Sequence, residues 1–305
     1  MTVRQLQRVG IALVLALFLW GLSEILSGGG DVIEEVELIR AISAGEVDSV
    51  VFQRAADTVR LARTGAAWTV NGFATAPDKV AELFGATADA VTGELAAQNP
   101  ASHERMGVDT ATARRLRVLA GSRTVADLLI GRQGRAARTV YARRVGDDNV
   151  YLLEGELVLL IDRPVSDWRD KRILSVEPDS IARISIERAG RRYELVRADS
   201  AWTFANGTAT DSAAMTRLLG ELRSLSAQGT GFATPAQADS ADFRRPDRRL
   251  TLRDAAGRTL GALAFDSTQS QFWVRRDGSE TVYQLYRWKV EDVTPADSVM
   301  RRQEG

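Results

Sequence analysis

The chain has a single histidine, His103, which is the natural starting point for a search for catalytic groups. Ser102 precedes it and Glu104 follows it, and serine, histidine and an acid are the residue types of a hydrolytic triad. Neighbours in sequence do not build a triad, however, because its side chains must meet in space from different elements. We therefore interpret His103 as an ordinary exposed loop residue and predict no catalytic residue.

Other site chemistry is restricted by what the sequence lacks. The absence of cysteine excludes disulfides, thiolate zinc sites and cysteine nucleophiles. The HExxH, P-loop, GxSxG, EF-hand and dinucleotide-binding motifs are also absent, and Gly28-Gly29-Gly30 is a linker because no strand precedes it and no Lys-Ser/Thr follows. We predict no metal, no cofactor, no small-molecule substrate and no enzymatic activity. The alternative in this class is a hydrolase that uses only Asp and Glu.

The charge balance argues against nucleic acid as a partner. Lys and Arg number 40, Asp and Glu also number 40, and the formal net charge is zero. A nucleic-acid-binding protein usually has an excess or a stripe of basic residues. Acidic residues stand among the many arginines throughout the chain, so we interpret the arginines as a solvated surface.

The densest group of charged and aromatic side chains lies near the middle of the chain. It consists of Trp168, Arg169, Asp170, Lys171 and Arg172. Two interpretations are open. The Trp stem and Asp-Arg pairs could form a latch between two halves of the chain, or the group could be a patch for docking a partner protein.

The N-terminal segment has the properties of a membrane anchor. Residues 9–26 contain an unbroken apolar run from Val9 to Leu22 and would span about 27 Å as a helix, close to the thickness of a bilayer. Arg4 and Arg8 precede the run and acidic residues follow it, which predicts a cytoplasmic tail over 1–8 and export of the remaining chain. A signal peptide cleaved near the small residues 27–30 is the alternative.

The rest of the chain contains two similar stretches about 134 residues apart. Trp68-Thr69-Val70 followed by Asn71-Gly72 corresponds to Trp202-Thr203-Phe204 followed by Asn206-Gly207. Because the Trp of each stretch precedes a tight turn, we interpret both as core anchors rather than as groove residues. The matches continue in order downstream and predict repeat unit 1 over 46–178 and repeat unit 2 over 179–305.

Each repeat alternates strand patterns with one helical pattern. Apolar residues at helical spacing predict helices over 80–91 and 215–225, and Gly and Asp residues at 146–149 and 277–279 predict hairpin turns. Residues 27–45 are predicted to form a linker or stalk, with a short helix over 32–43, and 233–247 a long loop. The predicted fold is α+β: an N-terminal transmembrane helix and two tandem, mainly antiparallel β units with one main helix each.

These features resemble the bacterial DUF4340 family. The resemblance is carried by the anchor, by each Trp with its following helix, by Met106-Gly107-Val108-Asp109, by Ile130-Gly131, by Val150-Tyr151 and by 168–174. The second repeat departs from it, with Phe243 to Asp247 in place of Met106 to Asp109. The resemblance implies an envelope protein, often encoded near ABC-type export or gliding-associated transport components, and implies no chemistry.

Together these observations predict a single-pass, membrane-anchored accessory or scaffold protein of the bacterial cell envelope. Its N-terminus would be cytoplasmic, its anchor would lie in the inner membrane and its bulk would be periplasmic. Its expected partners are the membrane and other envelope proteins, among them an ABC-type transport system. The alternative is a cleaved, secreted binding module that holds a ligand between its two repeats.

Overall fold

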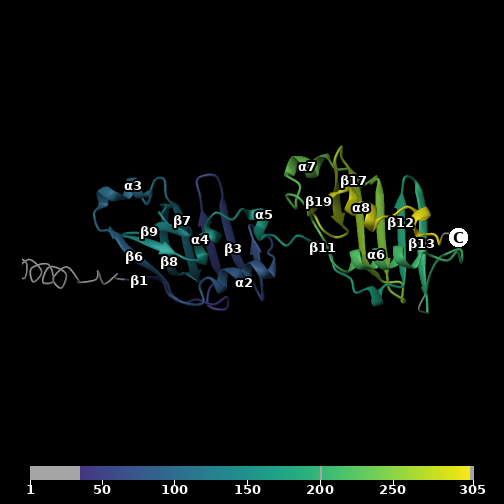
Figure 1. Cartoon of the computed structure of the whole chain (residues 1–305), viewed down its shortest axis with the longest axis horizontal. Helices are drawn as coiled ribbons and strands as arrows, with labels where there is room; N and C mark the ends of the chain where they lie inside the picture. The colour runs from purple at the N-terminus through teal and green to yellow at the C-terminus, as the bar shows by residue number, and fades with distance from the viewer. Residues whose placement is uncertain (1–34, 200, 303–305) are drawn as a thin grey trace, which may run out of the picture. The chain divides into compact units, whose positions relative to one another are not determined.

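The computed structural model describes residues 35–199 and 201–302. The anchor predicted over 9–26 lies outside these residues, as does the tail 1–8. Within the described residues no helix is long and apolar enough to cross a membrane. The chain divides into two compact units (Figure 1), one of which contains residues 35–71 and 80–163 and the other 72–79 and 164–302.

The first unit is built on an extended sheet whose strands from β1 to β4 run antiparallel to their neighbours. The order is β1-β6-β10-β9-β8-β7-β2-β3-β4. The two-residue strand β5 (Phe73–Ala74) belongs to the second unit. The strands are β1 (Glu35–Ile39), β2 (Ser49–Gln53), β3 (Thr58–Thr64), β4 (Ala67–Val70), β6 (Val91–Ala97), β7 (Arg114–Ala120), β8 (Arg123–Gln133), β9 (Thr139–Arg144) and β10 (Val150–Glu154).

Short helices pack on this sheet through a few apolar side chains. They are α2 (Pro77–Gly85), the 3-10 turn η1 (Pro100–Ser102), α3 (His103–Met106) and α4 (Glu156–Ile161). The ring of Trp68 lies 5.3 Å from that of Phe84 on α2, and both side chains are buried. Trp68 is therefore a core anchor, as predicted. The helix predicted over 80–91 begins three residues earlier and ends at Gly85.

The helix predicted over 32–43 is wrong for its described part, because residues 35–39 form strand β1. This strand pairs with β6, and Val36 lies opposite Gly93. A Cβ at Gly93 would lie 2.8 Å from Leu38 Cδ1, so the glycine allows the two strands to approach. Five residues are too few to separate a helical from a strand period, and pairing with β6 decides the structure.

The second unit contains a seven-stranded antiparallel sheet in the order β14-β13-β12-β16-β17-β18-β19 and a small β11-β15 pair. Its strands are β11 (Arg172–Leu174), β12 (Arg183–Arg188), β13 (Arg191–Ala198), β14 (Ala201–Phe204), β15 (Leu225–Ser226), β16 (Arg248–Arg253), β17 (Thr259–Ser267), β18 (Gln271–Arg276) and β19 (Val282–Tyr286). Its helices are α5 (Val165–Trp168), the 3-10 turn η2 (Pro178–Ser180), α6 (Ser212–Arg223), α7 (Pro235–Ser240), α8 (Arg287–Val293) and α9 (Asp297–Met300).

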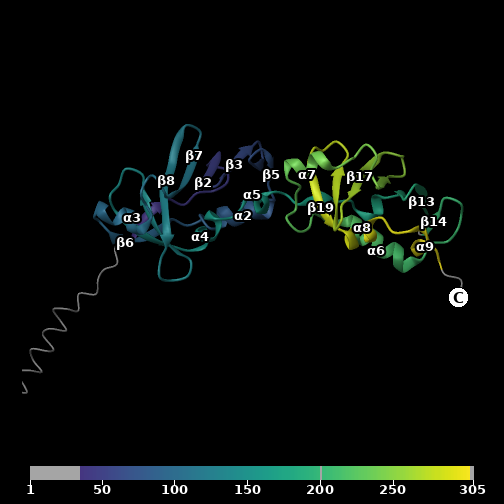
Figure 2. The ribbon, with the colours of Figure 1, turned by 90° about the horizontal axis from the view of Figure 1, so that it is seen from above.

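One face of this sheet holds the core. Apolar residues alternate along β12 and β16, and those on the inner face pack with Leu218 and Leu222 of α6 and Val290 of α8. Figure 2 shows α6 and α8 on the same side of the sheet. Helix α6 begins where Asp211 accepts a hydrogen bond from the amide of Ala214, which caps its N-terminus. Trp202, predicted to be a core anchor, is only partly buried and packs against the edge of this core.

The long loop predicted over 233–247 contains a short helix, α7. The side chain of Thr234 accepts a hydrogen bond from the amide of Gln237, whose side chain in turn accepts one from the amide of Thr234. This capping box, with Pro235 in the first helical position, accounts for the helix. The fold is therefore α+β with mainly antiparallel sheets, as the sequence predicts.

Gly131 in β8 tests how tightly the first unit is packed. A methyl group at this position would collide with the carbonyl of Met106 and lie 2.8 Å from Val108 Cγ1. We expect Gly131→Ala to lower the stability of the unit by about 1–3 kcal/mol, since the core cannot absorb the added volume. Differential scanning calorimetry should show one unfolding transition shifted downward by several degrees.

Gly85→Ala is the matched control, because a Cβ at Gly85 meets nothing within 4 Å. It should leave the transition unchanged or raise it slightly, given the helix propensity of alanine. If both substitutions changed the unfolding temperature equally, contact with Met106 and Val108 would not be what excludes a larger side chain at residue 131.

Candidate functional site

The cluster predicted over 168–172 lies in the second unit, close to residues 73–76 of the same unit. Trp168 is fully buried at the end of α5. The amide of Ala76 donates to the Trp168 carbonyl (2.9 Å), and the amide of Asp170 donates to the carbonyl of Ala74 (2.8 Å). The Arg169 guanidinium lies 3.7 Å from the centre of the Phe73 ring, and burial lowers its pKa. These contacts fix the segment to its neighbour.

The remaining charges of the cluster are paired within the segment. Arg172 forms an ion pair with Asp170 (3.0 Å), and Lys171 forms one with Asp167 (3.4 Å). Arg172 also belongs to β11, which pairs with β15. Whether the cluster acts as a latch or as a docking patch stays a prediction.

His103 contacts a hairpin turn. Its Nε2 lies 2.8 Å from the carbonyl oxygen of Asp148. The carboxylate of Asp147 accepts a hydrogen bond from the amide of Asn149 (3.0 Å), the turn-forming role expected at a hairpin tip. The imidazole therefore has a structural partner in the turn predicted over 146–149.

Three aspartates lie near one another in the second unit, where a purely acidic site would be sought. Burial raises the pKa of Asp266, and the charges of Asp247 and Asp242 raise it further. Their oxygens nevertheless accept local hydrogen bonds: Asp247 from the amide of Ser267 (2.7 Å) and Asp266 from the amide of Asp242 (3.1 Å). Nowhere in residues 35–199 and 201–302 do three or more His, Cys, Asp or Glu side chains form a group that could hold a metal ion.

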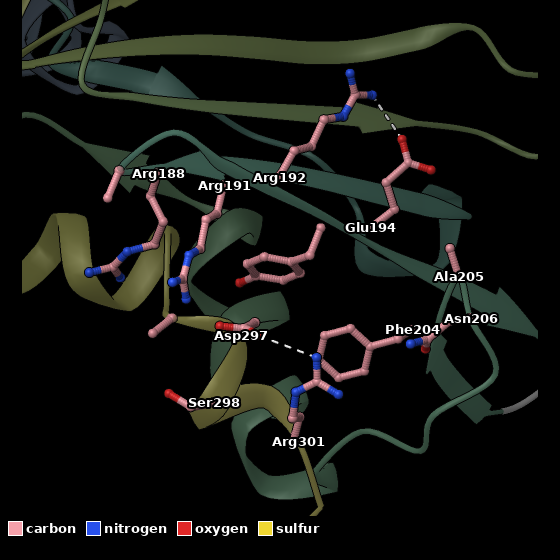
Figure 3. A pocket seen from close by; sticks show the side chains of 13 residues that line it. Arg188, Arg191, Arg192, Glu194, Phe204, Ala205, Asn206, Asp297, Ser298 and Arg301 are labelled. Carbon is pink, nitrogen blue, oxygen red and sulfur yellow. Dashed lines mark hydrogen bonds and ion pairs between the residues drawn. The ribbon is translucent and has the colours of Figure 1, made fainter.

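A surface hollow of about 1010 Å³ lies at the end of the β12–β13 hairpin, beside α9 (Figure 3). We call it the arginine pocket. It is lined by Arg188, Ala189, Arg191, Arg192, Tyr193, Glu194, Phe204, Ala205, Asn206, Ala296, Asp297, Ser298 and Arg301.

The hairpin turn places two arginines side by side. Ala189 and Gly190 have φ values of 50° and 71°, the backbone pattern of a two-residue type I′ turn. Arg188 is therefore directly opposite Arg191, and opposite residues in an antiparallel pair share a face. Arg192, the next residue, projects from the other face together with Glu194, as Figure 3 shows.

Arg188 is held by the end of α8. It donates to the carboxylate of Glu291 (2.9 Å) and to the carbonyl of Thr294 (2.8 Å). Arg248, which is almost buried, donates to the other oxygen of Glu291 and to the hydroxyl of Thr294 (3.0 Å). The hydrogen bond from Arg248 is the main cause that lowers the pKa of Glu291, and Arg188 contributes. One carboxylate thus serves two guanidinium groups.

The wall on the side of α9 consists of stacked rings and an ion pair. The Tyr193 hydroxyl donates to the carbonyl of Pro295 (2.6 Å), and burial strongly raises its pKa. The ring of Phe204 lies 5.8 Å from that of Tyr193. The Arg301 guanidinium lies 4.7 Å from the centre of the Phe204 ring and forms an ion pair with Asp297 (3.2 Å).

The carboxylates of the pocket are committed, as are three of its arginines, but Arg191 is not. Glu194 accepts hydrogen bonds from Arg192 and Arg183 (both 2.8 Å), and these bonds lower its pKa, so it is ionised at neutral pH and cannot act as a general acid. Exposed Arg191 has no ion-pair partner in the part of the chain that the structure describes. The arrangement is therefore suited to holding an anion.

Sequence reasoning missed this pocket. Two arginines follow the Ala189-Gly190 turn and one precedes it, and that local density is a signal. Arg301 and Glu291 stand more than 90 residues further along the chain, however, so their approach to the hairpin cannot be read from spacing.

Comparison with family models now identifies the family. The model described as "Domain of unknown function (DUF4340)" matches residues 68–246. The chain belongs to the DUF4340 family. The matched residues include the β12–β13 hairpin of the arginine pocket, whereas α8 and α9 follow the matched region. Neither the curated proteins nor the solved structures yield a match to the chain.

Glu291 gives a pH-dependent test of the pocket's supporting contacts. At pH 7 we expect Glu291→Gln to cost about 1–2 kcal/mol of stability, less than a fully buried charged hydrogen bond because the side chain of Glu291 is 43% exposed. Its pKa is lowered from 4.5, so its contribution is present above pH 4.5 and is lost as the pH falls through the lower folded value. Calorimetry at pH 7 and pH 3 measures the difference.

The matched control is Glu280→Gln, since Glu280 is exposed and forms no ion pair within the described residues. It should leave the transition in place at both pH values. A deficit of Glu291→Gln that is the same at pH 3 as at pH 7 would contradict an ionic contribution.

Proposed function

We propose that this DUF4340 protein is an exported, membrane-tethered accessory or scaffold protein of the bacterial envelope that acts by binding rather than by catalysis. The observation that carries the proposal is the state of the arginine pocket. Glu194 and Asp297 are both ion-paired, whereas the Arg191 guanidinium has no ion-pair partner among the described residues. Such a lining favours a bound anion over general-acid catalysis by a pocket carboxyl group, which would have to hold a proton near neutral pH.

The tether rests on sequence. Residues 9–26 have the length and composition of a spanning helix, and Arg4 and Arg8 before them favour a cytoplasmic N-terminus. Under this proposal the two units lie outside the cytoplasm and the anchor lies in the inner membrane. Association with an ABC-type transport system follows from family resemblance alone.

We also propose that the two units are copies of one ancestral unit. The strand order β4-β3-β2-β7-β8-β9-β10 in the first unit matches β14-β13-β12-β16-β17-β18-β19 in the second. Register supports the same correspondence. Val50 pairs with Leu61 and Val118, and Ile184, 134 positions later, pairs with Leu195 and Leu252.

Cell fractionation with N-terminal sequencing tests the tether. We expect the intact chain in the membrane fraction, extractable with detergent but not with high salt or carbonate, because a spanning helix is held by its apolar surface. Release by carbonate would indicate a peripheral protein instead. A soluble mature protein that begins near Gly30 or Asp31 would overturn the anchor and support the cleaved binding module.

Crosslinking in intact membranes, followed by mass spectrometry, tests the proposed partners. A transport-system component should be recovered above background with the full chain. A matched sample in which residues 1–30 are replaced by a cleavable signal peptide controls for contacts that depend only on export. If transport components are not enriched over that control or over background, the scaffold role in transport is contradicted.

A further inference from the structure

The hairpin end that forms the arginine pocket has a counterpart in the first unit, and the two differ in charge. By the proposed correspondence, Arg54 takes the place of Arg188 and Asp57 that of Arg191, each 134 positions earlier. Arg54 donates to both carboxylate oxygens of Asp57, at 2.6 and 2.7 Å. The pair is bidentate, so the charge at this end of the first unit is neutralised within the hairpin.

The two arginines make the same contact with the following helix. Arg54 donates to the carbonyl of Arg163 (3.0 Å), just beyond α4, and Arg188 donates to the carbonyl of Thr294 (2.8 Å), just beyond α8. This structural task is therefore common to both units. What differs is the opposite position, which holds an acid in the first unit and Arg191 in the second.

Directly opposite like charges destabilise a strand pair unless something neutralises them. The lining of the pocket contains four arginines, Arg188, Arg191, Arg192 and Arg301, and two carboxylates, Glu194 and Asp297. The set has an excess of two positive charges. A phosphomonoester carries about two negative charges once its second proton, with a pKa near 6, is lost.

The pocket has room for an organic ligand. It is a hollow of about 1010 Å³ that is open to solvent on one side, so a group bound to Arg191 can belong to a larger molecule. An inorganic anion alone would leave most of it filled with water. Arg191 at the rim can present a planar fork of donors, the geometry that matches phosphate oxygens.

We propose that the arginine pocket binds the phosphate group of an organic phosphomonoester, with Arg191 as its principal donor. This inference rests on the binding role proposed above and specifies the class of ligand. A soluble sugar phosphate and the headgroup of phosphatidic acid present the same chemistry, and the experiment distinguishes these two sources.

Isothermal titration calorimetry on the full chain in a neutral detergent provides the test, with glucose 1-phosphate, dihexanoyl phosphatidic acid and glucuronate as probes. At least one of the two phosphomonoesters should bind more tightly than glucuronate. Binding of glucose 1-phosphate alone identifies a soluble ligand, and binding of the short-chain lipid alone identifies a headgroup. Binding should tighten between pH 5.5 and 7.5, as the ligand loses its second proton.

The groups of the protein that face the ligand do not produce the same pH profile. They are the arginines, the carboxyls of Glu194, Glu291 and Asp297 and the phenol of Tyr193. The pKa values of Glu194 and Glu291 are lowered and that of Tyr193 is raised, which keeps these three groups from titrating between pH 5.5 and 7.5. The only histidine, His103, is in the first unit.

Three variants assign the binding to the pocket. Arg191→Gln should weaken it at least about tenfold, the equivalent of about 1.4 kcal/mol, and Arg191→Asp, which introduces the residue found in the first unit, should abolish it. Arg245→Gln removes another exposed arginine, one outside the pocket, and should bind as the wild type does. Because Arg191 is exposed, unchanged thermal unfolding should verify that its variants fold.

Two results would overturn the proposal in different ways. If glucuronate binds at least as tightly as both phosphomonoesters through Arg191, and its binding does not change with pH, the ligand class is wrong while the binding role stands. If no probe binds in an Arg191-dependent manner, the pocket is not a site for these anions, and the binding role loses the observation that carries it.

Discussion

The architecture around the pocket depends on one carboxylate that accepts hydrogen bonds from two arginines. Glu291 joins Arg188 of β12 and Arg248 of β16 to helix α8. The same two guanidinium groups reach Thr294, so the end of the helix is fixed against the sheet. The chain then passes Pro295, whose carbonyl accepts the hydroxyl of Tyr193, and enters α9. The turn before α9 is thus held at Thr294 and Pro295, and the hydrogen bond from the amide of Asp211 to the carbonyl of Met300 holds the far end of α9.

By the correspondence proposed between the two units, the first unit secures the matching point differently: its hairpin pairs an arginine with an acid, whereas the hairpin of the second unit places Arg191 opposite Arg188. In the first unit the carboxylate of Asp57, across the hairpin, neutralises Arg54. Arg54 also donates to the carbonyl of Arg163, just beyond α4. In the second unit the negative charge comes from the helix, through Glu291. Because Glu291 of α8 supplies the carboxylate for Arg188, the residue opposite Arg188 in the hairpin is not needed to neutralise it. An arginine there costs little in stability beyond its repulsion by Arg188, and a bound anion would remove that cost.

Local patterns made much of the fold predictable. The helical spacing over 215–225 and the turn residues at 146–149 each act over a few neighbours, and they correctly predicted α6 and the turn between β9 and β10. Strand β1 was missed because its five residues fit either period, and pairing with β6 decided between them. The pocket was missed for another reason: its residues come from segments far apart in the chain, and a net charge of zero over 305 residues conceals a local excess.

The local excess of positive charge remains because Glu291 already accepts hydrogen bonds from Arg188 and Arg248 and cannot also pair with Arg191. The side chain of Arg248 is only 10% exposed, and a guanidinium in such a place is costly without its carboxylate. Movement of Glu291 toward Arg191 would leave Arg248 uncompensated, so the carboxylate stays where the sheet and helix need it. Asp297 is similarly engaged by Arg301, which lies against the Phe204 ring. The charge of Arg191 is thus balanced by solvent or by an exchangeable anion. The contacts that hold Glu291 and Asp297 in place leave the Arg191 guanidinium free to bind that anion.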